Sequence, residues 1–197
     1  LAAYAYAASE ENASAGIVVT APTLGSCGIM AALMKYCIDD CDIDRKKCIE
    51  GLCVGGLFGN LIKTNATISG AVGGCQAEIG VACCMAAACY CYIKGGHRKE
   101  IEMAAEIAME HHLGLTCDPV GGYVIIPCIE RNAVGVVRAM DAATLAMELS
   151  KVKKNRVSFD MIVDTMNYTG NKLAMELKET GLGGLAIEVE VDSDSYE

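Results

Sequence analysis

Three of the twelve cysteines, Cys75, Cys117 and Cys128, are the side chains best placed to do chemistry. Cys75 and Cys117 lie beside glycine or proline in stretches that read as loops, and Cys128 follows Pro127 where a helix is expected to begin. The thiolate is the form of cysteine that binds metals, and a helix N-terminus stabilises it. The spacing is much wider than the Cys-x-x-Cys pattern of ferredoxins or zinc sites. The residues alone therefore leave metal or cluster binding as one hypothesis and a structural role as another.

Eight further cysteines fall in stretches with helical periodicity, and we expect them to be buried. Thiols in helices commonly pack as small hydrophobic groups, which explains them without a ligand role. A disulfide scaffold is a poorer explanation, because it is typical of short secreted chains with little core. The eight residues are Cys37, Cys41, Cys48, Cys53, Cys83, Cys84, Cys89 and Cys91.

Polar side chains in two other stretches are candidates for holding a substrate. Thr23 and Ser26, with the backbone N–H of Gly25, precede an expected helix and could bind a carboxylate there. An ordinary helix cap formed by the Ser26 hydroxyl is the alternative. A polar loop over residues 63–70, between two apolar helices, supplies a second group, unless its side chains satisfy only the loop's own backbone. Its candidate residues are Lys63, Thr64, Asn65 and Ser69.

Nearly every element that must position these residues has the helical period. Gly51, Gly55 and Gly59 recur every four residues, and beside polar residues this spacing predicts close packing of buried helices rather than membrane dimerisation. We predict a mainly α, single helical domain over residues 1–197, in which buried Ala-, Gly- and Cys-rich helices present ligand-bearing loops at their N-termini. The expected helices cover about 1–15, 29–37, 44–62, 74–93, 98–111, 128–151 and 159–178, with a β-like run at 123–126.

Composition and charge argue against several classes of protein. A net charge of −9 disfavours nucleic acid as a partner, since phosphate contacts need a basic surface. The longest uncharged apolar run, residues 79–93, is shorter than the roughly 20 residues of a membrane-spanning helix, so we expect a buried helix and no membrane. Reduced thiols in the cytoplasm suit the cysteines best. The chain opens on a helix-like stretch without Met, so we expect a fragment lacking N-terminal residues, with a solvated acidic tail over about 188–197.

Four long motifs carry a resemblance to a known family. They are Ala-Pro-Thr-Leu-Gly-Ser-Cys-Gly at 21–28, Ser-Gly-Ala-Val-Gly-Gly-Cys-Gln-Ala-Glu-Ile-Gly at 69–80, Gly-Leu-Thr-Cys-Asp-Pro-Val-Gly-Gly at 114–122 followed by Ile-Pro-Cys-Ile-Glu-Arg-Asn at 126–132, and Glu-Thr-Gly-Leu-Gly-Gly-Leu-Ala at 179–186. In this order, and over nearly the whole chain, they closely resemble the α chain or α part of iron–sulfur-dependent L-serine dehydratases.

The resemblance implies a [4Fe–4S] cluster held by Cys75, Cys117 and Cys128. Cys27 takes a place that need not be cysteine across the family, so it stays outside the implied ligand set. Three protein ligands leave one iron open as a Lewis acid for the hydroxyl and carboxylate of L-serine. The implied reaction gives pyruvate and ammonia without pyridoxal phosphate, in an oxygen-sensitive cytoplasmic enzyme of amino-acid degradation and gluconeogenesis.

The resemblance also implies a partner chain or domain, and alternative functions stay open. A histidine-containing motif of the family lies in a β chain or β domain that this sequence lacks, so we expect such a partner, an oligomer, and no identifiable base here. Some one-chain members end in a cysteine that reaches the open iron, whereas this chain ends Asp-Ser-Tyr-Glu. That ending favours a two-chain arrangement or a different cap. The alternatives are a related cluster-dependent lyase, such as a cysteine desulfidase, and a non-catalytic iron–sulfur or metal-binding module.

Overall fold

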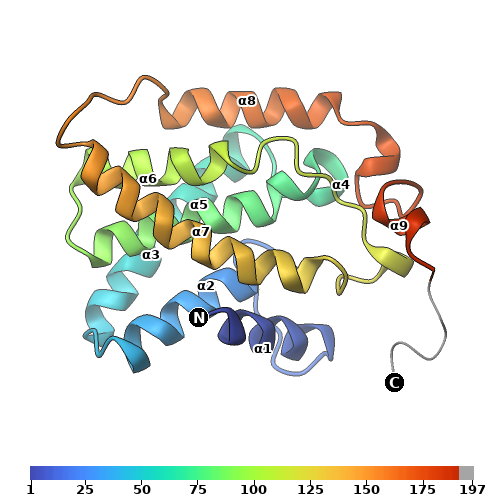
Figure 1. Ribbon diagram of the computed structural model, residues 1–197, viewed down its shortest axis with the longest axis horizontal. Helices are drawn as coiled ribbons and strands as arrows, with labels where there is room; N and C mark the ends of the chain where they lie inside the picture. The colour runs from blue at the N-terminus through green and yellow to red at the C-terminus, as the bar shows by residue number, and fades with distance from the viewer. Residues whose placement is uncertain (191–197) are drawn as a thin grey trace.

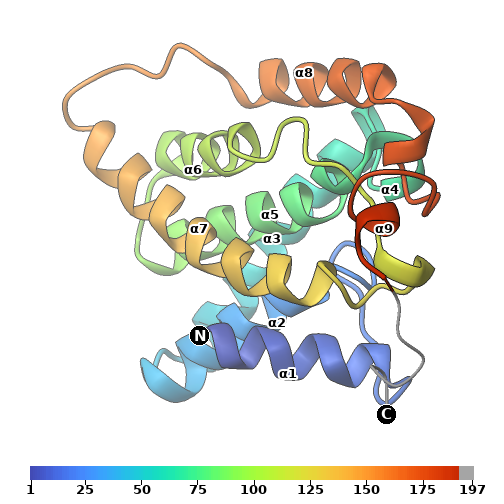
Figure 2. The same ribbon diagram turned by 45° about the vertical axis from the view of Figure 1, so that its right-hand side comes forward.

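The most apolar helix, α5 (Ile79–Ile93), lies at the centre of the molecule (Figures 1 and 2). The long helices α3 (Arg45–Asn65), α6 (Arg98–Glu110) and α7 (Cys128–Leu149) pack around it, and α2 (Cys27–Lys35) also contacts it. Because neighbours surround α5, it needs no polar face, which explains its nearly uninterrupted apolar sequence.

Two outer layers complete the bundle in this computed structural model, which describes residues 1–190. On one side α1 (Ala2–Ala13) packs against α2 and α7, and on the opposite side α8 (Phe159–Lys172) packs against α6 and the short α4 (Gly70–Gly73) (Figure 2). The short α9 (Leu185–Glu188) follows α8 along the chain. No strand forms within the described residues, so the prediction of a mainly α, single helical domain is confirmed.

Several predicted boundaries are corrected. Helix α3 continues to Asn65, and the side chains of Thr64 and Asn65 donate to carbonyls one turn back, so residues 63–65 lie on a helix and not in a loop. The helix expected from residue 74 begins at Ile79, and α8 ends at Lys172. The β-like run 123–126 forms no strand. A π-helical turn occupies Tyr36–Asp40, and tighter 3-10 turns occupy Cys75–Ala77, Val120–Gly122 and Met175–Leu177. Of the acidic tail, residues 191–197 lie outside the described part.

The glycine face of α3 packs directly on α5, as its spacing predicts. A Cβ atom on Gly51 would lie 2.7 Å from a side-chain carbon of Ile93, and one on Gly55 would lie 2.7 Å from the backbone carbonyl oxygen of Met85. The two helices can therefore approach this closely only because the α3 side of the contact has no side chain.

Gly55→Ala is expected to lower the free energy of unfolding by about 1–3 kcal/mol, because its new methyl group meets backbone that cannot move aside. Gly56→Ala on the same helix is the matched control, since nothing lies within 4 Å of its added Cβ. Its better helix propensity should raise stability by up to about 1 kcal/mol. Urea denaturation of the two variants gives the comparison, and equal shifts would contradict the close packing.

The prediction that helical thiols are buried holds for six of the eight cysteines and is wrong for Cys41 and Cys53, which are exposed. Cys41 follows the π-helical turn that ends α2, and Cys53 lies on α3 away from the glycine face. The four cysteines on α5, in contrast, are fully buried. Within the described residues, the stretch Cys75–Ile93 alone is long and apolar enough to cross a membrane, but 89% of it is buried in this protein's own core, so it is weak evidence for a membrane span.

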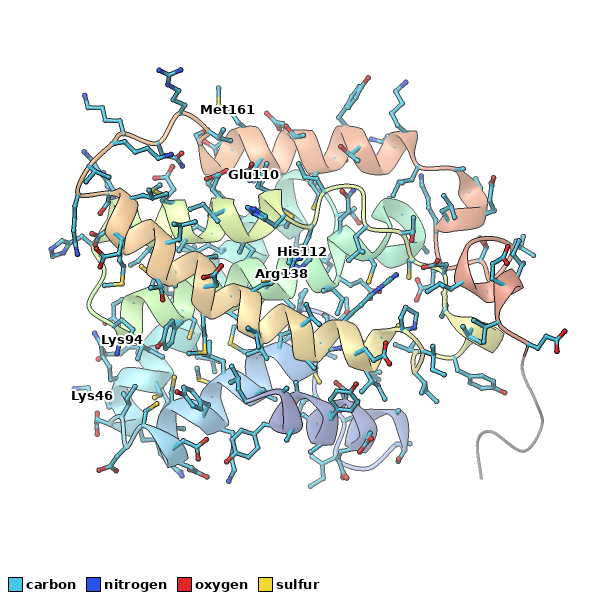
Figure 3. All side chains as sticks on the ribbon, in the orientation of Figure 1. Lys46, Lys94, Glu110, His112, Arg138 and Met161 are labelled. Carbon is cyan, nitrogen blue, oxygen red and sulfur yellow. The ribbon has the colours of Figure 1, made fainter. Side chains whose placement is uncertain are left out.

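Helix α6 carries a buried carboxylate, Glu106, beneath the connection from α7 to α8. Its Oε2 accepts a hydrogen bond from Nδ2 of Asn155 at 2.9 Å, whereas Oε1 has no partner within residues 1–190. Burial, with a further contribution from Glu110 one turn along α6 (Figure 3), raises the pKa of Glu106 from 4.5 to about 7. The fold therefore disfavours the ionised form of this side chain.

Glu106→Gln is expected to stabilise the protein by roughly 2 kcal/mol near pH 8 and to change little near pH 4. Between pH 4.5 and about 7 the unfolded chain releases the Glu106 proton while the folded chain keeps it, so stability falls as pH rises through this window. The glutamine is uncharged and escapes that loss. Urea denaturation at the two pH values measures it, with the exposed Glu102→Gln as control. An equal gain at both pH values would contradict the assignment.

Candidate active site

Two of the three predicted cysteine ligands lie together beside a carboxylate. The Sγ atoms of Cys75 and Cys117 and a carboxylate oxygen of Glu78 all lie within 4.8 Å of one another. Both cysteines are almost fully buried, and Glu78 is partly buried. A Cβ atom added to Gly70 would lie 2.7 Å from the Glu78 carboxylate and 3.1 Å from Sγ of Cys117, so any other residue at position 70 would crowd this group. Soft thiolates with one carboxylate form a donor set suited to iron or zinc.

Cys75 is held in the 3-10 turn that precedes α5. Gly74 enters that turn with a φ of +75°, and a Cβ there would lie 2.8 Å from the carbonyl oxygen of Leu115. The buried Gln76 fixes the turn from three directions. Its backbone N–H donates to Leu115, its Oε1 accepts from the N–H of Gly114, and its Nε2 donates to the carbonyl of Met166 on α8. The turn therefore brings Cys75 to the loop that carries Cys117.

Cys117 lies on an extended segment rather than at a helix N-terminus. Its N–H donates to the carbonyl of Leu177 at 2.8 Å, and its own carbonyl accepts from the N–H of Glu179. The two hydrogen bonds make a parallel β-bridge between Cys117 and Lys178, an isolated bridge within the described residues. The segment after α8 thereby runs beside the cysteine loop.

Cys128 is the first residue of α7, in agreement with the predicted helix start, but it is not part of the group formed by Cys75, Cys117 and Glu78. Burial raises its pKa to about 12, and the charge at Cys75 adds to the effect. Helix α7 begins at the end of the bundle where α4 and α9 lie (Figure 2). Asn132, one turn along α7, positions this end of the helix. Its Nδ2 donates to the carbonyls of Cys128 and Gly25 at 2.9 and 2.7 Å.

The neighbours of Cys75 lower the pKa of its thiol. A hydrogen bond from the Cys117 thiol lowers the pKa of Cys75, and the charge of Arg131 lowers it further, against the opposing effect of burial. The same hydrogen bond and burial raise the pKa of Cys117. Cationic neighbours are what a buried thiolate requires, and Arg131 provides one.

Arg131 also ties the site to the segment after α8. It donates to the carbonyl of Thr116 at 2.6 Å and to Oδ1 of Asp118 at 3.2 Å. The other oxygen of Asp118 accepts from the N–H of Leu185 at 2.9 Å, at the start of α9. Gly184 has a φ of +61°, and a Cβ there would lie 2.3 Å from that oxygen. The network therefore fixes α9 against the cysteine loop.

The first loop reaches the site through Thr23. Burial raises the pKa of Glu78, and a hydrogen bond with Thr23 opposes that rise, so Thr23 contacts the carboxylate beside the thiols. The Thr23 hydroxyl lies 2.9 Å from that of Ser26, which is fully buried and also donates to the carbonyl of Ala21. Ser26 occupies the N-cap position of α2 but makes no side-chain cap hydrogen bond, so the ordinary-cap alternative is wrong.

The polar residues predicted at 63–70 do not lie together in the structure. Ser69 directly precedes Gly70 and is partly buried next to the thiols. Lys63 and Asn65 are exposed at the end of α3, where Asn65 donates to its own helix. Lys63 faces the first loop across a cavity of about 310 Å³ that is also lined by Pro22. The structure thus brings Thr23 to the cysteines, Ser26 behind it, and leaves Lys63 and Asn65 outside.

Sequence reasoning assigned no role to five residues that build the site, although all of them lie inside the motifs already noted. Each is a charged or amide side chain within a glycine-rich or apolar motif, and this is the signal that could have identified them. They are Gln76, Glu78, Asp118, Arg131 and Asn132.

Known proteins with similar sequences indicate the same family as these motifs. The family model described as serine dehydratase alpha chain matches residues 1–186. The chain belongs to this family. Among curated serine dehydratase relatives, it is 49% identical to the L-serine dehydratase of Haemophilus influenzae, 50% to L-serine dehydratase TdcG of Escherichia coli and 48% to the L-serine dehydratase of Streptomyces coelicolor. Each match covers 94% of this chain but 41% of the relative, so the chain spans less than half the length of these relatives.

Proposed function

We propose that this chain is the α part of an L-serine dehydratase that depends on a [4Fe–4S] cluster. The observation that carries the proposal is the buried group of Cys75, Cys117 and Glu78, held by family motifs and kept free of further side chains at Gly70. L-Serine would lose its Cα proton and its hydroxyl as water, and the resulting aminoacrylate would hydrolyse to pyruvate and ammonia. The net reaction consumes no oxidant or reductant.

Cys75, Cys117 and Cys128 would hold the cluster. Two of the thiols already converge, the third starts α7 on the same side, and Arg131 offsets the negative charge that thiolates bring into the core. When bound, a cluster with one open iron supplies a Lewis acid for the hydroxyl and carboxylate of the substrate. We propose no role for pyridoxal phosphate.

Residues of the first loop would hold the substrate carboxylate. Thr23 contacts Glu78 and shares a hydrogen bond with Ser26 behind it, and the N–H groups at the start of α2 add positive potential there. Ser69, beside Gly70, is placed for a further polar contact. The positions of Thr23, Ser26 and Ser69 support a role in substrate binding more directly than those of Lys63 and Asn65. We keep the latter two as candidates near the first loop.

The rest of the enzyme would come from a partner. Because the chain spans 41% of its relatives' length, we propose a β chain or β domain that covers the site, supplies the base and takes part in an oligomer. We propose a cytoplasmic location, where the buried thiols stay reduced. The acidic net charge remains an argument against nucleic acid as a partner.

Substrate turnover by the anaerobically reconstituted enzyme, assembled with its partner, tests the proposal. Pyruvate should form from L-serine, and no sulfide should form from L-cysteine. Sulfide release without serine turnover would identify a desulfidase. An enzyme with its cluster in place that turns over neither amino acid, and whose iron spectrum does not change with serine, would be a non-catalytic module.

A further inference from the structure

Glu179 has an unusual backbone next to the thiols. Its φ is +61°, in the left-handed region that side-chain-bearing residues rarely adopt. Its N–H donates to the carbonyl of Cys117, and the β-bridge at Lys178 holds the preceding residue. Strained backbone of this kind costs about 1–3 kcal/mol and clusters at functional sites. The left-handed backbone of Glu179 therefore marks this position beside the thiols as a candidate functional position.

The Glu179 side chain is exposed and has no partner within the described residues. It takes part in none of the ion pairs within residues 1–190, and Arg131, the cation of the site, is paired with Asp118. The Glu179 backbone is fixed at the cysteine loop, because its N–H donates to the carbonyl of Cys117 and the neighbouring Lys178 forms the β-bridge with Cys117. Glu179 therefore borders the group of Cys75, Cys117 and Glu78.

We infer that Glu179 binds the α-ammonium group of the amino-acid substrate, an inference that rests on the proposed function. In that function the carboxylate and hydroxyl of L-serine are already assigned, and its ammonium group still needs an anionic acceptor. Glu78 is less suitable, because it lies between two sulfur atoms and Thr23. Glu179 offers an exposed carboxylate beside the cysteine loop, with no ion-pair partner within residues 1–190, and a charge-assisted hydrogen bond is the strongest contact available to an ammonium group.

Glu179→Gln in the assembled, anaerobically prepared enzyme is expected to weaken L-serine binding about 10–100-fold, the usual loss for a charge-assisted hydrogen bond. KM should rise by that factor while kcat changes less, and iron content should stay the same. L-Glycerate provides the decisive probe, because it keeps the carboxylate and the terminal hydroxyl and replaces the ammonium group by a hydroxyl. Its inhibition constant should change less than threefold, whereas that of L-serine analogues with an ammonium group should rise with KM.

Two further variants separate binding from folding. Glu176→Gln, an exposed carboxylate three residues earlier, should leave KM unchanged. Glu179→Gly removes the carboxylate but relieves the left-handed strain, so it should weaken serine binding without lowering the unfolding midpoint. A wild-type KM in Glu179→Gln or Glu179→Gly, or equal weakening of L-serine and L-glycerate, would overturn the inference. Calorimetry measures the affinity for L-serine directly and so tests the role of Glu179 without relying on pyruvate formation. An absence of pyruvate would therefore count against the proposed function alone.

Discussion

Cys128→Ala in the assembled enzyme is expected to lower pyruvate formation from L-serine by about 1,000-fold or more. The proposed function requires an iron that acts as a Lewis acid, and such an ion contributes several kcal/mol to the transition state. Loss of one of three protein ligands should release the cluster or move its open iron. This variant tests the third ligand in particular, because Cys128 lies outside the group formed by Cys75, Cys117 and Glu78.

Cys84→Ala is the matched control for Cys128→Ala. Cys84 is a fully buried thiol on α5, and it is not part of the group formed by Cys75, Cys117 and Glu78. Its loss should cost about 1 kcal/mol of stability and leave specific activity unchanged. Full activity in Cys128→Ala would instead support a ligand set of Cys75, Cys117 and Glu78, whereas equal losses in both variants would mean that any core thiol matters.

Arg131→Met is expected to lower the free energy of unfolding by about 2–4 kcal/mol, the largest stability effect that the structure predicts for one side chain. The Arg131 and Asp118 side chains are 17% and 5% exposed, and removal of one partner leaves the other charge buried without its ion pair. The carbonyl of Thr116 loses a hydrogen bond as well. Urea denaturation measures the change.

Arg138→Met is the control on the same helix. Arg138 is exposed on α7 (Figure 3), and it donates one long hydrogen bond to the carbonyl of His111 at 3.3 Å. Its replacement should change stability by no more than about 0.5 kcal/mol. In Asp118→Asn/Arg131→Met the two losses should not add, because both single variants break the same pair. Additive losses would show that the pair does not stabilise the fold.

The fold could be predicted from local sequence to a large extent. The apolar run of α5 and the four-residue spacing of Gly51, Gly55 and Gly59 are periodic signals that hold whatever surrounds them. The end of α3 could not be predicted in this way. Residues 63–65 are polar enough for a loop, but local side-chain hydrogen bonds keep them helical. Exposure of Cys41 and Cys53 likewise depends on which face of a helix meets its neighbours.

Part of the site was predictable from sequence, namely its cysteines and the hydroxyl side chains of Thr23, Ser26 and Ser69. The types of Cys75, Cys117 and Cys128 mark them as possible ligands, but spacing alone could not bring them together. The residues that position them act over long sequence distances: Asn132 bonds Gly25 across 107 residues, and the β-bridge joins Cys117 to a segment after α8. No local pattern encodes such contacts, so their partners become identifiable only in the folded chain.

Iron and acid-labile sulfide per chain, measured on anaerobically reconstituted protein, test the central claim most directly. The wild type should hold about four of each, Cys75→Ala should hold close to none, and Cys84→Ala should match the wild type. The Cys75 thiolate is the one that the Cys117 thiol and Arg131 stabilise, so its loss should matter most. Wild-type iron and sulfide in Cys75→Ala, or zinc in place of iron in the wild type, would contradict a cluster held by these cysteines.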